Sequence, residues 1–115
     1  MSSAQKIISW DDFAKLDIRV GTVIEVKDFP KALRPSYQLW IDFGELGIKK
    51  SSAQITAHYT KDMMKDRQVI AVVNFPVKQI ANFHSECLVL GVIGTDQSVI
   101  LLQPSQTVEN GCKIG

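Results

Sequence analysis

The chain has 115 residues and a nearly balanced charge, with 13 Lys and Arg against 12 Asp and Glu for a net charge of +1. This balance argues against a surface coated with phosphate-binding charge, because affinity for nucleic acid rises with the number of phosphates neutralised. A local basic patch remains compatible with it. A hydrophobic content of 45% and a length near the commonest domain size predict one soluble globular domain over residues 1–115.

The start of the chain and its cysteines both indicate the cytoplasm. The apolar patch Ile7-Ile8 is far shorter than the ~7–15 apolar residues of a secretory signal, and no stretch approaches the ~20 of a membrane span. Cys87 and Cys112 have neither the spacing of a metal site nor the density of a disulfide scaffold. We expect Cys87 in the core, Cys112 as a reduced surface thiol, and a cytoplasmic protein without membrane insertion.

The first predicted element is a short helix. Ser9 is placed to cap it, and Asp11 and Asp12 lie in its first turn, where carboxylates meet the positive end of the helix dipole. Apolar residues then recur at helical spacing: Trp10, Phe13 and Leu16. This spacing predicts an apolar helix face that packs on the rest of the domain.

A strand follows over Ile18–Val26. Strict alternation would place five residues on one face: Ile18, Val20, Thr22, Ile24 and Val26. Gly21 in mid-strand indicates a β-bulge or a tight bend of a barrel.

Further strands are expected along the rest of the chain, separated by turns. They are apolar runs or alternating segments: Tyr37–Phe43, Ile48–Ser52, Gln68–Val73, Cys87–Ile93 and Val99–Leu102. A loop with two prolines precedes Tyr37, and a short helical segment is expected over Thr60–Lys65. Short strands with a helix between the third and fourth fit a five-stranded Greek-key barrel with terminal extensions. Val108–Ile114 is expected to form a terminal edge segment on which a second subunit could dock.

The sequence lacks the common catalytic motifs. It contains no Gly-rich phosphate loop, no His-Glu-x-x-His and no Gly-x-Ser-x-Gly. His58 and His84 are isolated from each other and from any cysteine pair. We therefore expect a non-enzymatic protein with no catalytic residues, no metal and no cofactor.

Three segments carry residues suited to binding, and the first is Lys49–Gln54. Alternation separates its side chains onto two faces: Lys49, Ser51 and Ala53, and Lys50, Ser52 and Gln54. Lysines neutralise phosphate, while Ser and Gln hydrogen-bond phosphates or a peptide backbone. The alternative is an exposed strand with two solvated lysines.

The second segment, Asn74–Ile80, leaves a buried strand with an asparagine, an aromatic and a base close together. Phe75 beside Lys78 could stack on a base of single-stranded nucleic acid. Phe75 could equally line an apolar pocket for a peptide side chain, or close the end of the barrel as part of the core.

The third segment, Phe83–Glu86, comes directly before the Cys87 strand. Glu86 would lower the positive potential near the lysines and suit peptides with basic residues. Its simpler role is a hydrogen bond that closes the loop.

Taken in order, several segments together resemble a known family: Phe13–Val23, Asp42–Gly44, Lys49–Ile55, Asn74–Pro76 and Ser85–Leu90. Their types and spacing are similar to the tRNA-binding domain family, an all-β oligonucleotide-binding (OB-fold) barrel that also occurs at the C terminus of many methionyl-tRNA synthetases. The usual Val-Ser-Gly of that family stands here as Ser52-Ala53-Gln54, which resembles a branch of stand-alone, secretion chaperone-like members.

This resemblance implies a five-stranded Greek-key OB-fold barrel that forms a homodimer through its terminal extensions. It implies a non-enzymatic module that binds unfolded polypeptide or preprotein in protein export, with a tRNA-binding structural cofactor as the alternative. The predicted peptide contacts are Phe75, Ser52, Gln54, Asn74, Ser85 and Glu86. The predicted nucleic-acid contacts are Arg19, Lys49, Lys50 and Lys78.

Overall fold

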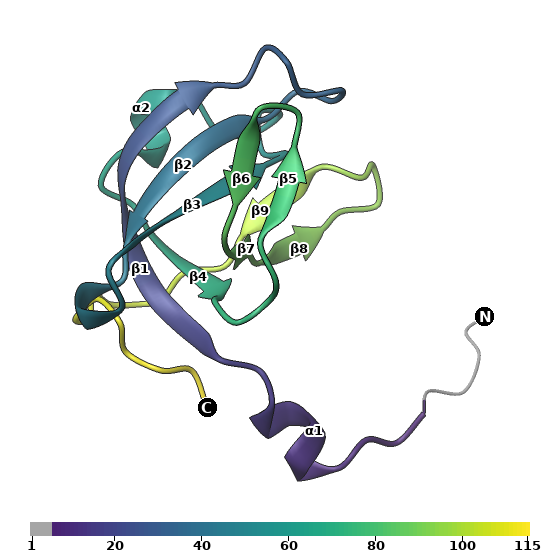
Figure 1. Ribbon diagram of the computed structural model, residues 1–115, viewed down its shortest axis with the longest axis vertical. Helices are drawn as coiled ribbons and strands as arrows, with labels where there is room; N and C mark the ends of the chain where they lie inside the picture. The colour runs from purple at the N-terminus through teal and green to yellow at the C-terminus, as the bar shows by residue number, and fades with distance from the viewer. Residues whose placement is uncertain (1–5) are drawn as a thin grey trace.

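A computed structural model describes residues 6–115 of the chain. One antiparallel sheet, with strand order β3-β2-β1-β4-β7, curls into a nearly closed five-stranded barrel (Figure 1). The barrel strands are β1 Ile18–Asp28, β2 Tyr37–Asp42, β3 Ile48–Ala53, β4 Gln68–Val72 and β7 Leu88–Val89. The predicted all-β barrel of the OB-fold type is confirmed.

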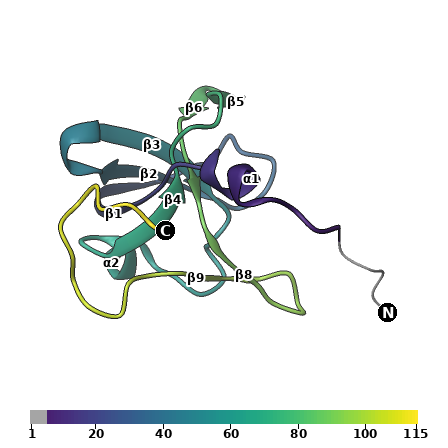
Figure 2. The ribbon, with the colours of Figure 1, turned by 90° about the horizontal axis from the view of Figure 1, so that it is seen from below.

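Two hairpins complete the strands. The first pairs β5 (Lys78–Ile80) with β6 (Phe83–Ser85), and the second pairs β8 (Gly91–Ile93) with β9 (Val99–Leu101). Both lie to the right of the barrel strands in Figure 1, and Figure 2 shows the first at the top and the second at the bottom of the view. The sequence did not predict the first hairpin, because each of its strands has only three residues.

The single strand expected over Cys87–Ile93 is wrong. The chain changes partner at Leu90, whose backbone N–H donates to Ile70 O and whose carbonyl accepts from Leu102 N–H. β7 therefore belongs to the barrel while β8 belongs to the second hairpin. A continuous apolar run could not reveal this change, because both halves are apolar and partly buried.

β1 departs from strict alternation. Its pairing with β2 shifts register between Val23 and Glu25, so the bulge lies at Ile24. Of the two alternatives for Gly21, a bulge or a tight bend, the bulge is therefore wrong. Val23 is fully buried and Ile24 only partly, which contradicts the predicted single face through Ile24. Gly21 instead permits a close approach, because a Cβ there would lie 2.6 Å from Cγ2 of Ile41.

The core fills the inside of the barrel. Alternation in β2 is confirmed, since Leu39 and Ile41 of β2 and Phe43 just after it are fully buried. Cys87 joins the same cluster, as expected, and burial raises the pKa of its thiol to about 12. α2 (Lys61–Met64) begins after its N-cap Thr60 and contributes Met64 to the core.

α1 (Trp10–Ala14) begins with the predicted cap. Ser9 Oγ accepts from the backbone N–H of Asp12 at 3.1 Å, and Asp12 Oδ2 accepts from that of Ser9 at 3.0 Å. The hydrogen bond that the Asp12 carboxylate accepts from the Ser9 backbone N–H, followed by the one from Lys15 Nζ at 3.4 Å, lowers the pKa of Asp12.

The apolar face predicted to pack on the domain does not do so. Trp10 is 90% exposed, and α1 stands away from the barrel (Figure 1). The reason is local: Asn74 accepts from Asp17 N–H at 2.9 Å and donates to Lys15 O at 2.7 Å, so the linker backbone is anchored rather than the helix face.

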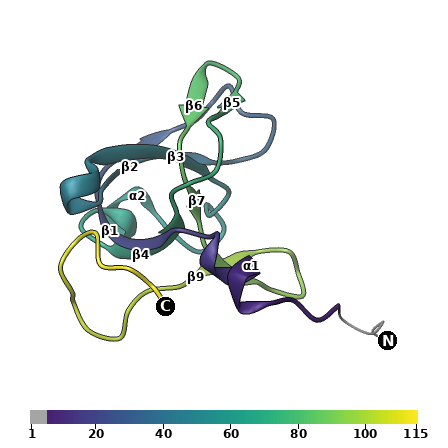
Figure 3. The same ribbon diagram turned by 60° about the horizontal axis from the view of Figure 1, so that its bottom comes forward.

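The C-terminal segment returns to the barrel along β1 (Figure 3). Gly111 N–H donates to Val20 O at 2.7 Å, and Ile114 N–H donates to Ile18 O at 2.8 Å. The segment thereby covers the part of β1 that β2 does not reach. A short 3-10 helix, η1 (Gly44–Leu46), lies between β2 and β3, and no helix within residues 6–115 has the length and apolar character needed to cross a membrane.

Candidate ligand-binding groove

The third predicted segment closes the barrel. Glu86 Oε1 accepts from the backbone N–H of Lys50 at 2.9 Å, and the backbone N–H of Glu86 donates to Lys50 O at 2.7 Å. Ser85 Oγ accepts from Ser52 N–H at 3.1 Å, and Ser51 Oγ donates to Cys87 O at 2.9 Å. Side chains thus replace part of the missing ladder between β3 and β7, and contact of Glu86 with a ligand stays a prediction.

Beside this closure lies a surface groove of about 1240 Å³. Its walls are the loop 31–36, the end of β3 with residues 54–55, and the segment 75–81. Residues between 85 and 99, from the end of β6 through β7 to the β8–β9 hairpin, complete them. It brings together five of the residues predicted to bind, from distant parts of the chain: Ser52, Gln54, Phe75, Lys78 and Ser85. We call this feature the groove.

Phe75 contributes an apolar surface to the groove. Its side chain is 48% exposed, so the interpretation of Phe75 as core is wrong. Leu88 and Ile93 also line the groove and are exposed, while the lining residues Ile80 and Val99 are half-buried. Large apolar side chains that remain open to solvent around one hollow are a feature of binding sites.

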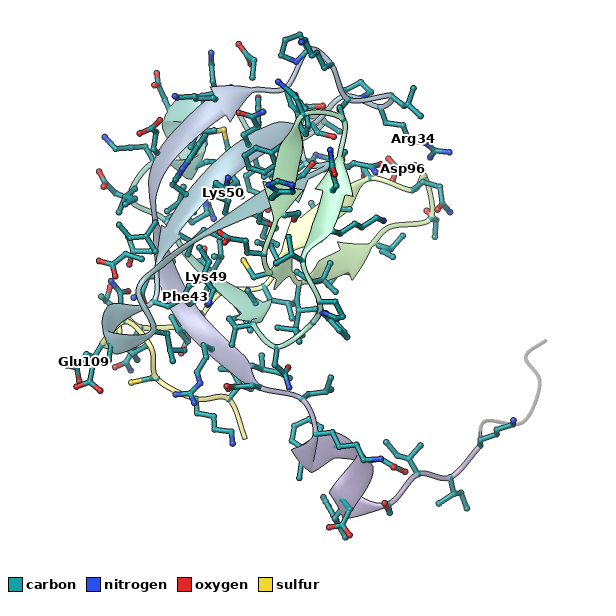
Figure 4. The ribbon with its side chains drawn as sticks, viewed as in Figure 1. Arg34, Phe43, Lys49, Lys50, Asp96 and Glu109 are labelled. Atoms are coloured by element: carbon teal, nitrogen blue, oxygen red, sulfur yellow. The ribbon has the colours of Figure 1, made fainter. Side chains whose placement is uncertain are left out.

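The charged side chains that line the groove are all basic. They are Lys31, Arg34 and Lys78, and no Asp or Glu is among the lining residues. Within residues 6–115, none of the three forms an ion pair. Figure 4 shows Arg34 at the outer end of its loop, away from the barrel strands.

One wall of the groove is held by a chain of polar side chains. His58 Nε2 lies 2.7 Å from Ser98 Oγ, and Ser98 Oγ donates to Asp96 Oδ1 at 2.6 Å. The bonds from Ser98 lower the pKa of Asp96. Because the hydroxyl proton is directed at Asp96, His58 does not accept it, so this is not an activated serine nucleophile. The contact ties the β8–β9 turn to the segment before α2.

The other five predicted residues lie outside the groove: Glu86 and Lys50, whose mutual hydrogen bonds close the barrel, and Asn74, Arg19 and Lys49. Asn74 anchors the linker after α1 through its two hydrogen bonds. Arg19 pairs with Asp17 at 2.6 Å and donates to Gly111 O at 3.0 Å, and the hydrogen bond with Asp17 raises the pKa of Arg19. Lys49 is half-buried on β3. The hydrogen bonds that the structure shows for the Asn74 and Arg19 side chains are all to other residues of the chain.

A second surface, which we call the aromatic–lysine patch, contains the predicted nucleic-acid contact Lys50 together with residues that the sequence did not single out. Lys27 Nζ lies 5.0 Å from the ring centroid of Trp40, and Lys50 Nζ lies 5.1 Å from that of Phe83. The Trp40 and Phe83 rings meet edge to face at 5.8 Å. In the β2–β3 register Trp40 lies opposite Lys50. A tryptophan on the outward side of β2 was the signal that could have identified it.

The comparisons with known proteins agree with this architecture. The family described as "Putative tRNA binding domain" matches residues 18–113. Methionine–tRNA ligase of Pyrococcus abyssi is 34% identical over 107 residues, which are 93% of this chain and 14% of the ligase. The chain therefore spans about one seventh of the length of that relative.

Two solved structures are similar over nearly the whole of both chains. The chaperone CsaA of Bacillus anthracis str. Ames superposes with a TM-score of 0.91 at 48% identity, covering 96% of this chain and 100% of CsaA. CsaA chaperone protein of Picrophilus torridus gives 0.88 at 53% identity, covering 95% and 100%. The expected resemblance to stand-alone chaperone-like members is confirmed. The chain belongs to the tRNA-binding domain family.

Proposed function

We propose that the chain is a non-enzymatic binding module that holds extended segments of unfolded polypeptide or preprotein in the groove, acting in the cytoplasm before export. The observation that carries this proposal is a groove with an exposed aromatic, Phe75, beside a strand edge that is free to pair. The similarity to two CsaA chaperones supports the same function.

The free edge belongs to β5. β5 pairs with β6 on one side only, and no other backbone partner of Lys78–Ile80 occurs within residues 6–115. Alternate residues of such a strand direct their N–H and C=O groups away from the partner strand. An extended peptide could add to this edge as a further strand, with its side chains entering the groove alternately.

The apolar lining would then provide affinity. Phe75, Ile80 and Val99 line the same hollow, and side chains of an unfolded segment would bury apolar surface against them. This kind of contact tolerates many sequences, because it depends on apolar area and backbone hydrogen bonds rather than on one side chain.

We further propose a homodimer. Ile8, Trp10 and Phe13 in the N-terminal segment and Ile100 and Leu102 at β9 are exposed apolar side chains. A monomer rarely leaves such surfaces uncovered, and a second copy could bury them. Light scattering during gel filtration is expected to give about twice the 12.8 kDa monomer mass. A mass equal to the monomer at micromolar concentration would contradict the dimer.

Phe75→Ala is expected to weaken binding of an unfolded polypeptide by ~1–3 kcal/mol, the range for truncation of an interface anchor. The folded state should keep its stability, because the side chain is half-exposed. The measurement is fluorescence anisotropy of a labelled, permanently unfolded polypeptide.

Val77→Ala is the matched control for Phe75→Ala. Val77 is exposed in the same loop but is not among the lining residues of the groove. Its truncation should leave affinity unchanged. Equal effects of the two substitutions, or no effect of either, would show that the polypeptide binds elsewhere.

The second candidate function is that of a tRNA-binding structural cofactor. The aromatic–lysine patch favours it, because the half-buried Trp40 ring could stack on a base while Lys27 and Lys50 meet phosphates, although the Phe83 ring beside it is buried. The family match supports it equally. Charge reversal at Lys27 and Lys50 separates the two functions, since neither residue lines the groove.

A further inference from the structure

We infer that the groove selects acidic–apolar polypeptide: extended segments in which carboxylate side chains flank apolar residues. This inference rests on the proposed function and specifies its ligand. It reverses the sequence-based expectation that Glu86 would favour basic peptides, because Glu86 accepts from Lys50 N–H and does not line the groove.

Charge complementarity is the first argument. Three cations, Lys31, Arg34 and Lys78, line the groove, and no Asp or Glu is among its lining residues. The ion pairs within residues 6–115 use other bases: Lys15, Arg19, Lys27 and Lys61. The groove cations are therefore free to meet a ligand's carboxylates, and they would repel a basic ligand.

The positions of charged and apolar side chains provide the second argument. All three cations are exposed, whereas Ile80, Val89 and Val99 are half-buried in the lining. Charge therefore lies at the rim and apolar surface lies deeper. A matching ligand has apolar side chains at its centre and acidic ones at its flanks.

The carboxylate of Asp96 lowers the positive electrostatic potential at one side of the groove. It lies on the β8–β9 turn next to the lining residue Gln97, and its Oδ1 accepts from the N–H and the hydroxyl of Ser98. Figure 4 shows Arg34 and Asp96 on the same side of the molecule. We therefore expect Lys31 and Lys78 to contribute most to the selection.

A polypeptide fits this groove better than a nucleic-acid strand. The free edge of β5 offers both donors and acceptors, which match a peptide backbone, whereas a phosphodiester backbone carries acceptors only. A half-buried apolar lining also disfavours the hydrated phosphates that would have to lie near it. The positively charged start of a secretory signal would be repelled, so acidic–apolar stretches of the mature chain are the expected ligands.

The test uses three labelled peptides with one apolar centre and flanks of Glu, Gln or Lys. At roughly 50 mM salt the Glu peptide should bind at least about tenfold more tightly than the Lys peptide, with the Gln peptide between them. At roughly 500 mM salt the three affinities should converge, because the rim charges are screened.

Lys31→Glu with Lys78→Glu should invert this order. Lys65→Glu with Lys113→Glu is the charge-matched control, since both residues are exposed and lie outside the groove. The control should keep the preference for the Glu peptide. If the double reversal does not fold, the three-peptide series on the unmodified protein still decides the question.

The outcomes separate the inference from the proposed function. Equal affinity for the three peptides at low salt, or a preference for the Lys peptide, would overturn the selection while leaving polypeptide binding in place. The selection would also be overturned if the control reversals changed the order of peptide affinities as much as the groove reversals do. The net charge of the surface, and not the groove, would then be responsible. No binding of any peptide would overturn both.

Discussion

Phe43→Ala is expected to lower the free energy of unfolding by ~3–5 kcal/mol. The Phe43 ring is fully buried and belongs to the core cluster inside the barrel. Its removal loses the transfer free energy of the ring and leaves a cavity that rigid strands cannot fill. Urea unfolding followed by tryptophan fluorescence or circular dichroism measures the change.

Phe75→Ala is the matched control for this stability measurement. It deletes the same ring from a half-exposed position, where substitutions change stability by about 0.5 kcal/mol or less. A destabilisation of similar size for the two variants would mean that the Phe43 ring does not lie in the core.

Gly21→Val tests the close approach that makes room for Phe43. A Cβ at Gly21 would lie 2.7 Å from Cδ1 and Cε1 of the Phe43 ring, so we expect a destabilisation of ~1–3 kcal/mol from overpacking. In the double variant with Phe43→Ala the new side chain occupies space that the ring has left. The double variant should therefore be more stable than the sum of the two single effects implies. Strict additivity would contradict direct packing between the two positions.

The features predictable from the sequence are those set by local patterns. Ser9 and Asp12 lie three residues apart and form the cap that their spacing predicts. Alternation identified β2 and its buried side chains because β2 is regular along its whole length. A strand that alternates regularly along its whole length can therefore be identified from its own sequence.

The features that escaped prediction depend on partners far away in the chain. The turn of the β5–β6 hairpin contains Ala81 at φ 52°, a conformation usually signalled by Gly or Asn. The bulge of β1 becomes visible only through its register with β2. α1 contains an apolar stripe, but hydrogen bonds from Asn74 to its linker direct it away from the barrel.

Individual residues of the candidate site could be predicted from the sequence, but the groove that they form could not. Phe75, Lys78 and Ser52 were identified from their types, and the groove brings them together. Lys31 and Arg34 were missed, because they lie in a proline-rich loop whose position over the groove follows from the fold. Asn74 and Arg19 were chosen for the right chemistry, yet they form hydrogen bonds within the chain.

The aromatic–lysine patch yields the experiment that separates the two candidate functions. Lys27→Glu with Lys50→Glu should weaken tRNA binding on the order of a thousandfold, since each reversal exchanges an attraction of about 1 kcal/mol for a repulsion of similar size, and the two together cost about 4 kcal/mol. The dependence of log K on log salt should become shallower by about two units, one for each phosphate that a lysine no longer neutralises. Filter binding of bulk tRNA across a salt series measures both quantities.

Polypeptide binding by the same double variant should stay within about twofold of the unmodified protein, because both lysines lie outside the groove and act on it only through screened, long-range charge. Phe75→Ala should give the opposite pattern, with weaker polypeptide binding and unchanged tRNA binding. Two surfaces with independent ligands would produce this double dissociation. If the lysine reversals abolish both activities while Phe75→Ala affects neither, the groove is not the polypeptide site and an electrostatic RNA binder is the better account of the chain.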